Sequence, residues 1–376
     1  MTLPSGGKPT VVLVTGHYWH SKRRAGFHWL ADAYHRLGWQ VLFFTASVSW
    51  LSYLRRDHRT LYGSFWEQRN KLWQVGEDFY SYVWFTPFHP ANLRSGLLNT
   101  LSKPLFRTYG SLPLGPVEPF LRKANLFVFE STPGLLLLKR VKAINPKARY
   151  VYRVSDDLRL LKNHPLVLEA EEDGLAHFKL ISTPSKAIFE RFKDLHPNVK
   201  LHPHGIRKDL FDREYPNPYQ GRPGPHLVFV GISHFDEDFI NRASRMFPTA
   251  QFHIIGPLRR TTNVHNVSYY GEMPFEKTVP FILHADVGLA TWSCLPGAES
   301  FSDSLKVIQY TYAKLPVLMP NCIPATRPNI IIYVPGDDES IRSAMLKALS
   351  FDHSQVDRTG IYSWEELALA IAGGAP

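Results

Sequence analysis

Cysteine is scarce in this chain of 376 residues, where it occurs only as Cys294 and Cys322. The two residues do not have the spacing of a metal site. So few thiols in a chain of this length are typical of a reducing compartment. The sequence therefore predicts a protein without a cysteine-based metal centre that works in a reducing environment.

Long apolar runs are also missing. No window approaches 18 apolar residues without a charge, so we expect no membrane-spanning helix. The opening residues MTLPSGGKPT contain no charged segment leading into an apolar stretch, so we expect no signal peptide. Apolar residues still make up 44% of the chain, enough for the cores of two domains. These features predict a cytoplasmic or peripheral protein.

Several common site motifs do not occur: GxGxxG, GxxxxGK[ST] and the GxSxG elbow are all absent. Their absence argues against a fingerprinted dinucleotide fold, a P-loop and an α/β-hydrolase. His17, His20 and His28 lie near the first predicted strand, and histidines so placed are more often packing or surface residues than ligands. The sequence therefore gives no reason to expect a bound metal or another cofactor.

Acidic residues are rare in the first part of the chain. Residues 1–150 contain 20 Lys and Arg against 7 Asp and Glu, whereas the remaining residues contain 23 against 26. An excess of 13 positive charges predicts an anionic partner. No nucleic-acid-binding motif occurs, so we expect an anionic membrane surface or a lipid pyrophosphate. A basic surface that only aids solubility is the alternative.

The order of predicted elements indicates a doubly wound α/β architecture. Short runs rich in β-branched and aromatic residues alternate with helix-like segments, which favours parallel sheets. Strands are predicted near residues 10–16, 40–46, 79–87, 126–130, 148–155 and 179–184, and again near 226–231, 251–256, 286–291 and 316–320. Helices are predicted near 23–39, 133–144, 185–195, 235–247, 274–285 and 303–314.

A change in composition divides the chain. Residues 207–225 contain four prolines and two glycines, and we predict an interdomain linker there. We therefore expect an N-terminal domain over 1–206 and a second domain over 226–362. The helical pattern of 363–376 could return to the first domain.

Aromatic, aliphatic and basic residues are interleaved between Ser47 and Arg122. Trp50, Tyr53 and Trp66 are mixed with arginines, and a leucine-rich stretch follows from Leu97 to Leu105. This mixture is typical of a surface that lies among lipid headgroups. Ordinary helix packing, with arginine on the solvent side, would produce the same pattern.

The segment VYRVSDD, residues 151–157, carries the most informative carboxylates. Asp156 and Asp157 follow a strand that is predicted to be buried, so at least one lies at the carboxyl edge of the sheet. A carboxylate there can accept a proton from an acceptor hydroxyl, as a general base must. The alternative is that Ser155 or an aspartate only caps the next helix.

Two segments of the second domain suggest phosphate binding. In SFSDSLKVIQY, residues 300–310, polar residues precede an amphipathic helix, whose free backbone N–H groups favour phosphate. Lys306 lies in its first turns and could offset charge on a leaving diphosphate, and Gln309 could bond a ribose hydroxyl. VGISHFD, residues 230–236, is a strand that runs into a loop with one glycine. A capped surface helix would explain the first pattern equally well.

Taken in order, eight segments resemble the GumK-type glucuronosyltransferases of xanthan biosynthesis, which are inverting GT-B enzymes. They are GHYWHSKRRAGFH, VFESTPG, INPKARYVYRVSD, VGISHFD, FHIIG, YYGEM, DSLKVIQY and LPVLMPN. The resemblance implies two Rossmann-like, doubly wound domains that face a central cleft. It covers most of the chain, although no single segment is specific to the family.

The resemblance also implies roles for individual residues. Asp156 matches the catalytic base of the family. Residues that match its donor site are Gly231, Ser233, Glu272, Met273, Trp292, Ser304, Leu305, Lys306 and Gln309. Residues expected on the acceptor side are His17, Arg23, Arg24 and Glu130.

We therefore expect transfer of glucuronate from UDP-glucuronate to a polyprenyl-diphosphate-linked oligosaccharide in bacterial exopolysaccharide biosynthesis. The expected place is the cytoplasmic face of the inner membrane, with peripheral attachment and no metal. Ser233, Leu305, Arg207 and the loop 293–301 depart from the family pattern, which leaves UDP-glucose or another UDP-hexose as an alternative donor. A nucleotide-sugar epimerase and a non-catalytic sugar-nucleotide binding protein are more remote alternatives.

Overall fold

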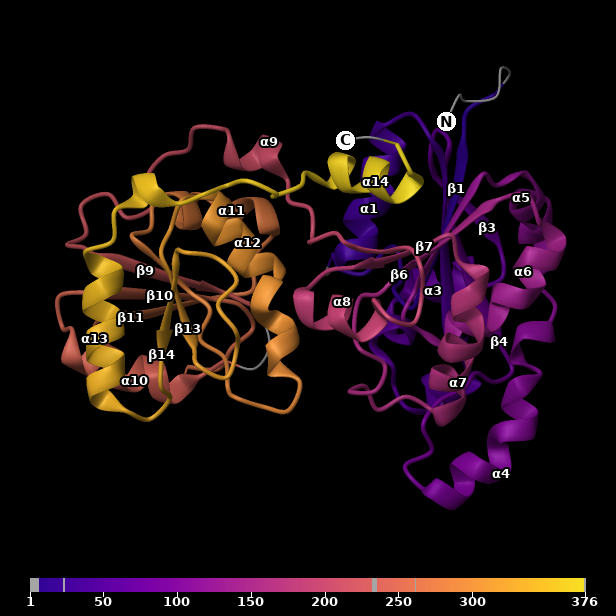
Figure 1. Ribbon diagram of the computed structural model, residues 1–376, viewed down its shortest axis with the longest axis horizontal. Coiled ribbons are helices and arrows are strands. Elements are labelled where there is room, and N and C mark those ends of the chain that lie inside the picture. Colours follow the sequence, from indigo (N-terminus) through magenta and orange to yellow (C-terminus); the bar gives the residue numbers. More distant parts are fainter. Residues whose placement is uncertain (1–6, 23, 232–234, 261, 375–376) are drawn as a thin grey trace. The chain divides into compact units, whose positions relative to one another are not determined.

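The computed structural model describes residues 7–22, 24–231, 235–260 and 262–374. The chain divides into two compact units. The first unit contains Met1–Pro203 and Trp364–Pro376, and the second contains His204–Ser363. Figure 1 shows a central sheet flanked by helices in each unit.

The first unit is built on a mostly parallel sheet. Its strands lie side by side in the order β3 (Leu72–Gly76), β4 (Phe79–Thr86), β2 (Gln40–Ser49), β1 (Thr10–Thr15), β5 (Leu126–Glu130), β6 (Arg149–Arg153), β7 (Leu180–Thr183) and β8 (Val199–Leu201). Only the pairing of β3 with β4 is antiparallel among the described strands. Every residue of β1 and β5 is buried, as expected for strands covered on both faces.

The helices of the first unit cover both faces of this sheet. They are α1 (Gly26–Arg36), α2 (Trp50–Leu54), α3 (Gly63–Gln68), α4 (Gly96–Arg107), α5 (Glu118–Lys123), α6 (Leu138–Ile144), α7 (Pro165–Gly174), α8 (Lys186–Phe192) and α14 (Trp364–Ala372). Helix α14 packs against α1, where Tyr34 Oη donates a hydrogen bond to the Ala368 carbonyl at 2.9 Å. The terminal helix thus belongs to the first unit, as the sequence pattern suggested.

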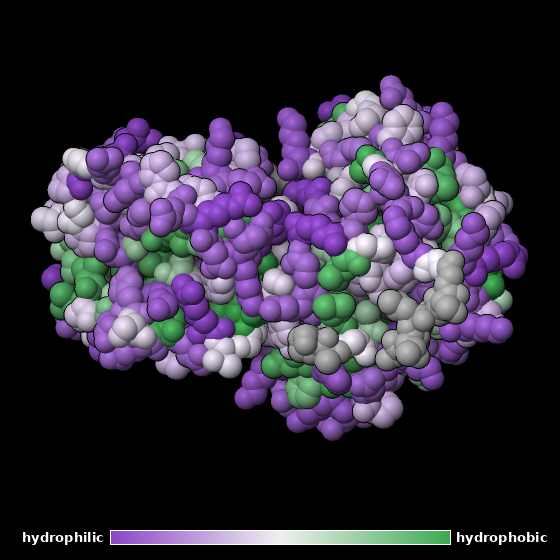
Figure 2. Space-filling view, turned by 90° about the horizontal axis from the view of Figure 1, so that it is seen from above, coloured by the Kyte–Doolittle hydropathy of each residue, from purple (hydrophilic) through white to green (hydrophobic). Residues whose placement is uncertain are grey.

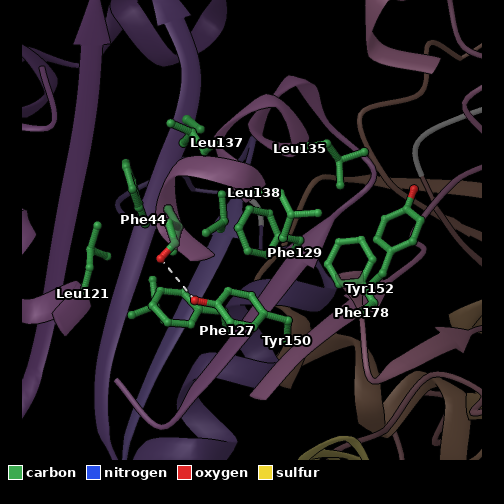
Figure 3. Packing of buried hydrophobic residues seen from close by; sticks show 14 of the residues in the cluster. Phe44, Leu121, Phe127, Phe129, Leu135, Leu137, Leu138, Tyr150, Tyr152 and Phe178 are labelled. Carbon is green, nitrogen blue, oxygen red and sulfur yellow. Dashed lines mark hydrogen bonds between the residues drawn. The ribbon is translucent and has the colours of Figure 1, made fainter. Parts of the chain in front are cut away.

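The main core of the first unit combines aromatic strand residues with leucines from the helical segment after β5. Figure 3 shows Phe127 stacked on Tyr150, with ring centroids 5.0 Å apart, and Tyr152 beside Phe178 at 5.3 Å. The Tyr150 hydroxyl donates to the Asn145 carbonyl at 2.6 Å, which satisfies the buried oxygen. This packing fills one face of β5 and β6, the two strands whose carboxyl ends lead to Glu130 and Asp156.

The second unit contains a fully parallel sheet in the order β11 (Val267–Gly271), β10 (Gln251–Ile255), β9 (His226–Val230), β12 (Val287–Leu289), β13 (Val317–Pro320) and β14 (Ile330–Tyr333). Its helices are α9 (Lys208–Phe211), α10 (Glu237–Met246), α11 (Phe275–Leu283), α12 (Leu305–Tyr312) and α13 (Asp338–Leu349). Successive residues of β9 point to opposite faces, with Leu227 and Phe229 in one hydrophobic cluster and Val228 in the other.

The segment 207–225 differs from the interdomain linker that its prolines predicted. It belongs to the second unit, and Leu210, Phe211 and Tyr219 are buried in that unit's core. Tyr219 Oη donates to the Phe281 carbonyl at 2.7 Å. Its apolar residues anchor the segment, while its prolines and glycines only shape the path of the chain.

Candidate active site

A cavity of about 930 Å³ opens in the first unit at the carboxyl ends of β1, β2, β5 and β6. Here β1 lies between β2 and β5, so the strand order reverses at this point. Ligands of open α/β sheets bind at such a reversal, beyond the carboxyl ends of the strands. The titratable residues that line the cavity are His17, Arg55, Asp57, His58, Arg59, His89, Arg94, Glu130, Asp156 and Lys162.

The two carboxylates that follow β6 have different surroundings. Asp157 is buried, and its oxygens accept hydrogen bonds from Arg159 Nη2 at 2.6 Å and Arg191 Nη1 at 2.7 Å. It also accepts the backbone N–H of Arg159 at 3.0 Å. Asp156 is exposed and lines the cavity, and its carboxylate has no partner within the described part of the chain. Asp157 is therefore structural, and Asp156 is free to meet a ligand.

Glu130, the last residue of β5, joins the ends of three strands. Its buried carboxylate accepts hydrogen bonds from the Thr15 hydroxyl, from the Gly16 N–H at 3.2 Å and from Ser155 Oγ at 2.8 Å. His17 Nε2 lies 3.4 Å from Glu130 Oε1. The carboxylate thus holds His17 at the cavity wall and fixes the residue before Asp156.

The backbone that carries Asp156 is fixed a second time by Ser131. Ser131 Oγ accepts the N–H of Ser155 at 3.1 Å and the N–H of Asp156 at 3.0 Å. Two successive backbone donors on one hydroxyl restrict the turn after β6. The Asp156 carboxylate is therefore presented from a rigid segment, as a catalytic group requires.

The pKa shifts at this edge follow from burial and neighbouring charge. Burial raises the pKa of Glu130, but His17 and the hydrogen bonds from His17, Thr15 and Ser155 outweigh it and lower this pKa to about 2. Asp156 is accessible from the cavity, but desolvation by the cavity walls and the negative charge of Glu130 raise its pKa, against the opposing effect of His17. A raised pKa makes Asp156 a stronger base than an ordinary aspartate.

Glu130 favours the protonated form of His17. Burial lowers its pKa, yet the charge and hydrogen bond of Glu130 outweigh burial and raise it above the usual value. The result is a histidine that carries positive charge over a wider pH range. It balances Glu130 and leaves Asp156 as the unpaired anion.

Arg59 also lines the cavity and lies next to the end of β1. Its guanidinium donates to Asp57, to the Gly16 carbonyl at 2.5 Å and to the Ser47 carbonyl at 3.1 Å. These bonds tie the turn after α2 to the ends of β1 and β2. Because Asp57 neutralises its charge, Arg59 shapes the cavity and adds little net charge to it.

Lys306 occupies the matching carboxyl edge in the second unit. Its Nζ is buried without a hydrogen-bond partner, 3.6 Å from the ring centroid of Phe229 and 4.8 Å from that of Trp292. Burial lowers its pKa well below the usual value. A buried cation without a partner is costly, so this position favours an anionic ligand that would pair with it.

The start of α12 adds further unpaired polar groups beside Lys306. Ser304 precedes the helix, forms no side-chain cap, and its buried Oγ has no partner. The first backbone N–H groups of a helix point away from the helix and favour anions. A phosphate there would satisfy these groups and Lys306 together.

Two glycines leave space next to Lys306. A Cβ on Gly231 would lie 2.7 Å from Lys306 Nζ, and a Cβ on Gly256 would lie 1.9 Å from the Gly231 carbonyl oxygen. Gly256 also has a φ of +149°, which side chains rarely tolerate. The close approach of these backbones depends on glycine at both positions.

The loop 293–301 follows Trp292 and is linked covalently to the sheet edge. Cys294 forms a disulfide with Cys322, with Cα atoms 5.9 Å apart. This pairing was not expected from the sequence, in which the two residues were interpreted as thiols. Strands β12 and β13 are parallel neighbours, and the segments that follow them start side by side despite a separation of 28 residues.

No group of three or more His, Cys, Asp or Glu side chains among the described residues could hold a metal ion. Likewise, no helix in the described ranges is long and apolar enough to cross a membrane.

Comparisons with known proteins agree with this arrangement. Residues 13–184 match the family model described as glucuronosyltransferase GumK, N-terminal domain. Over 355 residues the chain is 31% identical to the UDP-glucuronate:glycolipid 2-beta-glucuronosyltransferase of Xanthomonas campestris pv. campestris, covering 92% of this chain and 86% of that protein. The chain belongs to the GumK glucuronosyltransferase family. It is therefore a glycosyltransferase.

Solved structures show the fold of this GumK-family chain. A trehalose-phosphate synthase (UDP-forming) from Burkholderia xenovorans matches with a TM-score of 0.58 and 13% identity, covering 98% of this chain and 100% of that one. Anabaena HepE in complex with UDP-glucose matches with a TM-score of 0.57 and 12% identity, covering 96% and 95%. The predicted GT-B architecture of two Rossmann-like domains is confirmed.

The structure brings several predicted site residues of this GumK-family chain together within each unit. His17, Glu130 and Asp156 line one cavity in the first unit. In the second, Gly231, Trp292, Ser304 and Lys306 gather at the carboxyl edge. Met273 and Leu305 pack partly against the core of the second unit, Gln309 is buried in α12, and Glu272 is exposed after β11. Their predicted roles stay predictions.

Three predicted residues cannot be joined to these groups. Arg24 does not line the cavity, because it pairs with Asp32 and lies 4.4 Å from the Trp19 ring centroid. Arg23 and Ser233 lie outside the described residues.

Sequence reasoning missed most of the basic cavity wall. Four residues of this wall come from loops that contain no recognisable motif: Arg55, His89, Arg94 and Lys162. The sequence pattern marked Arg55 only as one arginine among aromatic residues. A signal that could have found them is their position: they fall between predicted strands, where loops at the carboxyl edge must lie.

Proposed function

We propose that the chain transfers glucuronate from UDP-glucuronate to a polyprenyl-diphosphate-linked oligosaccharide, with inversion, in bacterial exopolysaccharide assembly. The observation that carries the proposal is the free carboxylate of Asp156 in the cavity, beside a second aspartate that is fully occupied. The named activity of the Xanthomonas relative supports the choice of donor and of a glycolipid acceptor.

In the proposed reaction, Asp156 takes the proton from an acceptor hydroxyl. The acceptor oxygen then forms a bond to the anomeric carbon of the sugar, and the bond between that carbon and the UDP oxygen breaks. The electron pair leaves with UDP, and the configuration at carbon inverts. Glu130 and His17 position the segment around Asp156 through the bonds from Ser155, Thr15 and Gly16.

The second unit is proposed to stabilise the leaving group. Lys306 Nζ and Ser304 Oγ are buried and unpartnered, and the free N–H groups at the start of α12 lie beside them. A diphosphate would receive hydrogen bonds from all three, and these strengthen as charge develops on the leaving oxygen. We propose that these groups act without a metal ion.

The proposed attachment to the membrane rests on exposed apolar side chains. Trp50 and Leu54 of α2 are 52% and 75% exposed, and Leu97 and Leu101 of α4 are 69% and 67% exposed. In Figure 1, α4 lies at the end of the first unit opposite α14, and the face seen in Figure 2, on the α14 side, is mostly hydrophilic with small separate apolar patches. We propose that the α2 and α4 side contacts the cytoplasmic leaflet peripherally, where basic residues attract anionic lipid.

The test measures product formation with glycolipid extracted from producing membranes, with UDP-glucuronate, UDP-glucose and other UDP-hexoses as donors. Product mass identifies the sugar transferred. Faster turnover of UDP-glucose would overturn the choice of donor and leave the glycosyltransferase. Conversion of the UDP-sugar without acceptor would indicate an epimerase.

A pair of neighbouring variants tests the base. Asp156→Asn should lower kcat by about 10²–10⁴ and leave UDP affinity and stability unchanged, because its carboxylate has no structural partner. Asp157→Asn is the matched control and should lower stability by roughly 3–5 kcal/mol, since it leaves the buried Arg191 with one carboxylate fewer. Full activity of Asp156→Asn would remove Asp156 from the mechanism.

A further inference from the structure

Three cations at the cavity of the first unit have no anionic partner. Arg55, Arg94 and Lys162 line it, and none forms an ion pair with any described residue. By contrast, Arg59 lines the same cavity but forms an ion pair with Asp57, so these two charges neutralise each other. Unpaired cations that converge on a concave surface are the usual footprint of an anionic ligand.

Hydrogen bonds between the loops bring these cations to one part of the cavity. Asn92 Nδ2 donates to the Asn163 carbonyl at 3.2 Å, which joins the loop of Arg94 to the loop of Lys162. The Arg94 N–H donates to Asn92 Oδ1 at 2.8 Å. Arg55 acts electrostatically on His89, which lines the same cavity and bonds Ser49 before α2.

The same wall contains a polar group that lacks a partner. Ser47 lines the cavity, is 6% exposed, and its buried Oγ forms no hydrogen bond within the described chain. Ser47 and Arg94 also have left-handed backbones, with φ of 65° and 60°. Such conformations cost free energy in residues other than glycine and concentrate at binding sites. An unpaired donor and two strained residues thus accompany the cations.

Each of the three cations adjoins exposed apolar side chains in the sequence. Arg55 follows Leu54 at the end of α2, and Arg94 precedes Leu97 and Leu98 at the start of α4. Lys162 follows Leu160 and Leu161, which are 49% and 40% exposed. A free phosphate would gain nothing from these apolar neighbours, whereas a lipid that carries phosphate would use both.

The cations also stand apart from the catalytic carboxylate. No ion pair in the described part of the chain joins the Asp156 carboxylate to Arg55, Arg94 or Lys162, although all four residues line the cavity. One cavity therefore offers a proton acceptor in one part and unpaired positive charge in another.

We propose that Arg55, Arg94, Lys162 and the Ser47 hydroxyl form a subsite for the diphosphate of a lipid-linked acceptor, at the boundary between the cavity and the apolar side chains of α2 and α4. This inference rests on the proposed function for the identity of the acceptor. The subsite fixes one end of the acceptor, and the sugar hydroxyl at the other end reaches Asp156.

The test is the binding of farnesyl diphosphate to the full chain, measured by calorimetry at low salt with saturating UDP to occupy the nucleotide site. Farnesol and inorganic pyrophosphate are the comparison ligands. The triple variant Arg55→Gln/Arg94→Gln/Lys162→Gln should bind farnesyl diphosphate at least about 100-fold more weakly, given about tenfold for each charge-assisted bond. Ser47→Ala should cost several-fold.

The matched control is Lys71→Gln/Lys123→Gln/Lys147→Gln, which removes the same charge from exposed positions outside the cavity. It should bind farnesyl diphosphate like the wild type. An unchanged affinity of the cavity variant, or an equal loss in the control, would overturn the subsite. Equal affinity for pyrophosphate and farnesyl diphosphate would refute the lipid part and indicate a free phosphate.

These outcomes are separable from the proposed function, because the binding assay needs no turnover. A chain that binds farnesyl diphosphate through these residues but transfers no glucuronate would keep the subsite and lose the proposed reaction. A chain that transfers glucuronate to glycolipid but binds farnesyl diphosphate equally well without the three cations would do the reverse.

Discussion

Replacing Lys306 with methionine should make the second unit more stable and its nucleotide site weaker. Lys306 Nζ is buried between the rings of Phe229 and Trp292 and has no hydrogen-bond partner. A buried polar group without a partner costs about 1–3 kcal/mol. Methionine has a similar length, carries no such group, and its sulfur packs favourably against aromatic rings. We therefore expect Lys306→Met to raise the free energy of unfolding by about 1–3 kcal/mol.

The same substitution should weaken UDP binding, because the charged amine pairs with the diphosphate only in the complex. A hydrogen bond to a charged group contributes about 1.5–3 kcal/mol, which corresponds to a loss in affinity of about 10- to 150-fold. At a pH between the two pKa values, binding should also take up a proton, since burial lowers the pKa of the free amine and the diphosphate raises it again. The wild-type affinity should therefore fall as pH rises from the pKa of the free amine to that of the complex, and level off above it.

Two assays test this pair of effects. Guanidinium denaturation gives the stability without ligand, and calorimetry in buffers of different ionisation enthalpy gives affinity and proton uptake. Lys277→Met, at an exposed position of α11, is the control and should change neither. A less stable Lys306→Met protein with unchanged UDP affinity would refute the reasoning, because Lys306 would then be a structural residue.

Three shorter predictions concern pH, the strand-end carboxylate and the membrane. Burial lowers the pKa of His28, His89 and His253 to about 3, so between about pH 6.5 and pH 3 each takes up a proton only on unfolding. The free energy of unfolding, measured by denaturant titration from pH 8 to 5, should therefore fall below about pH 6.5, by about 2 kcal/mol for each histidine at pH 5. Glu130→Gln places an amide donor against the donors of Thr15, Gly16 or Ser155, which should lower the free energy of unfolding by roughly 2–4 kcal/mol. It should also shift the acid limb of the pH–rate profile to lower pH, since the Glu130 charge no longer raises the pKa of Asp156. Leu97→Ser/Leu101→Ser should reduce binding to anionic vesicles at least tenfold, whereas Leu346→Ser, at an exposed position of α13, should not; equal losses would argue against α4 as the contact.

Much of the sheet architecture could be predicted from the sequence, because buried parallel strands are short, apolar and flanked by turns. Strands β1, β5, β9 and β10 lie where the apolar runs predicted them. Strands β3, β8, β11 and β14 were missed, since all four are partly exposed edge strands. Such strands are defined by pairing with a neighbour rather than by their own pattern.

The candidate site, like the sheets, could be predicted only in part from the sequence. The position after β6 predicted at least one of Asp156 and Asp157 at the sheet edge, and the family resemblance favoured Asp156. The pattern could not show that Arg191, which lies 34 residues later, pairs with Asp157. The Cys294–Cys322 bond depends likewise on the adjacency of β12 and β13. Local patterns predict which residues lie at the end of a strand, whereas partners from distant segments decide which side chain stays free.

The position of α14 has a consequence for the order in which the protein can assemble during synthesis. Its buried residues Trp364, Leu367 and Ile371 complete the packing around α1, but the ribosome makes them only after the whole of the second unit. Domains usually fold in the order of their synthesis. Here the first unit cannot complete its folding before the second unit has been synthesised. The apolar surface of α1 stays uncovered in the nascent chain until residues 364–372 emerge. A released chain that ends before residue 364 would therefore contain the whole second unit and an unfinished first one, which is the form that chaperones would meet.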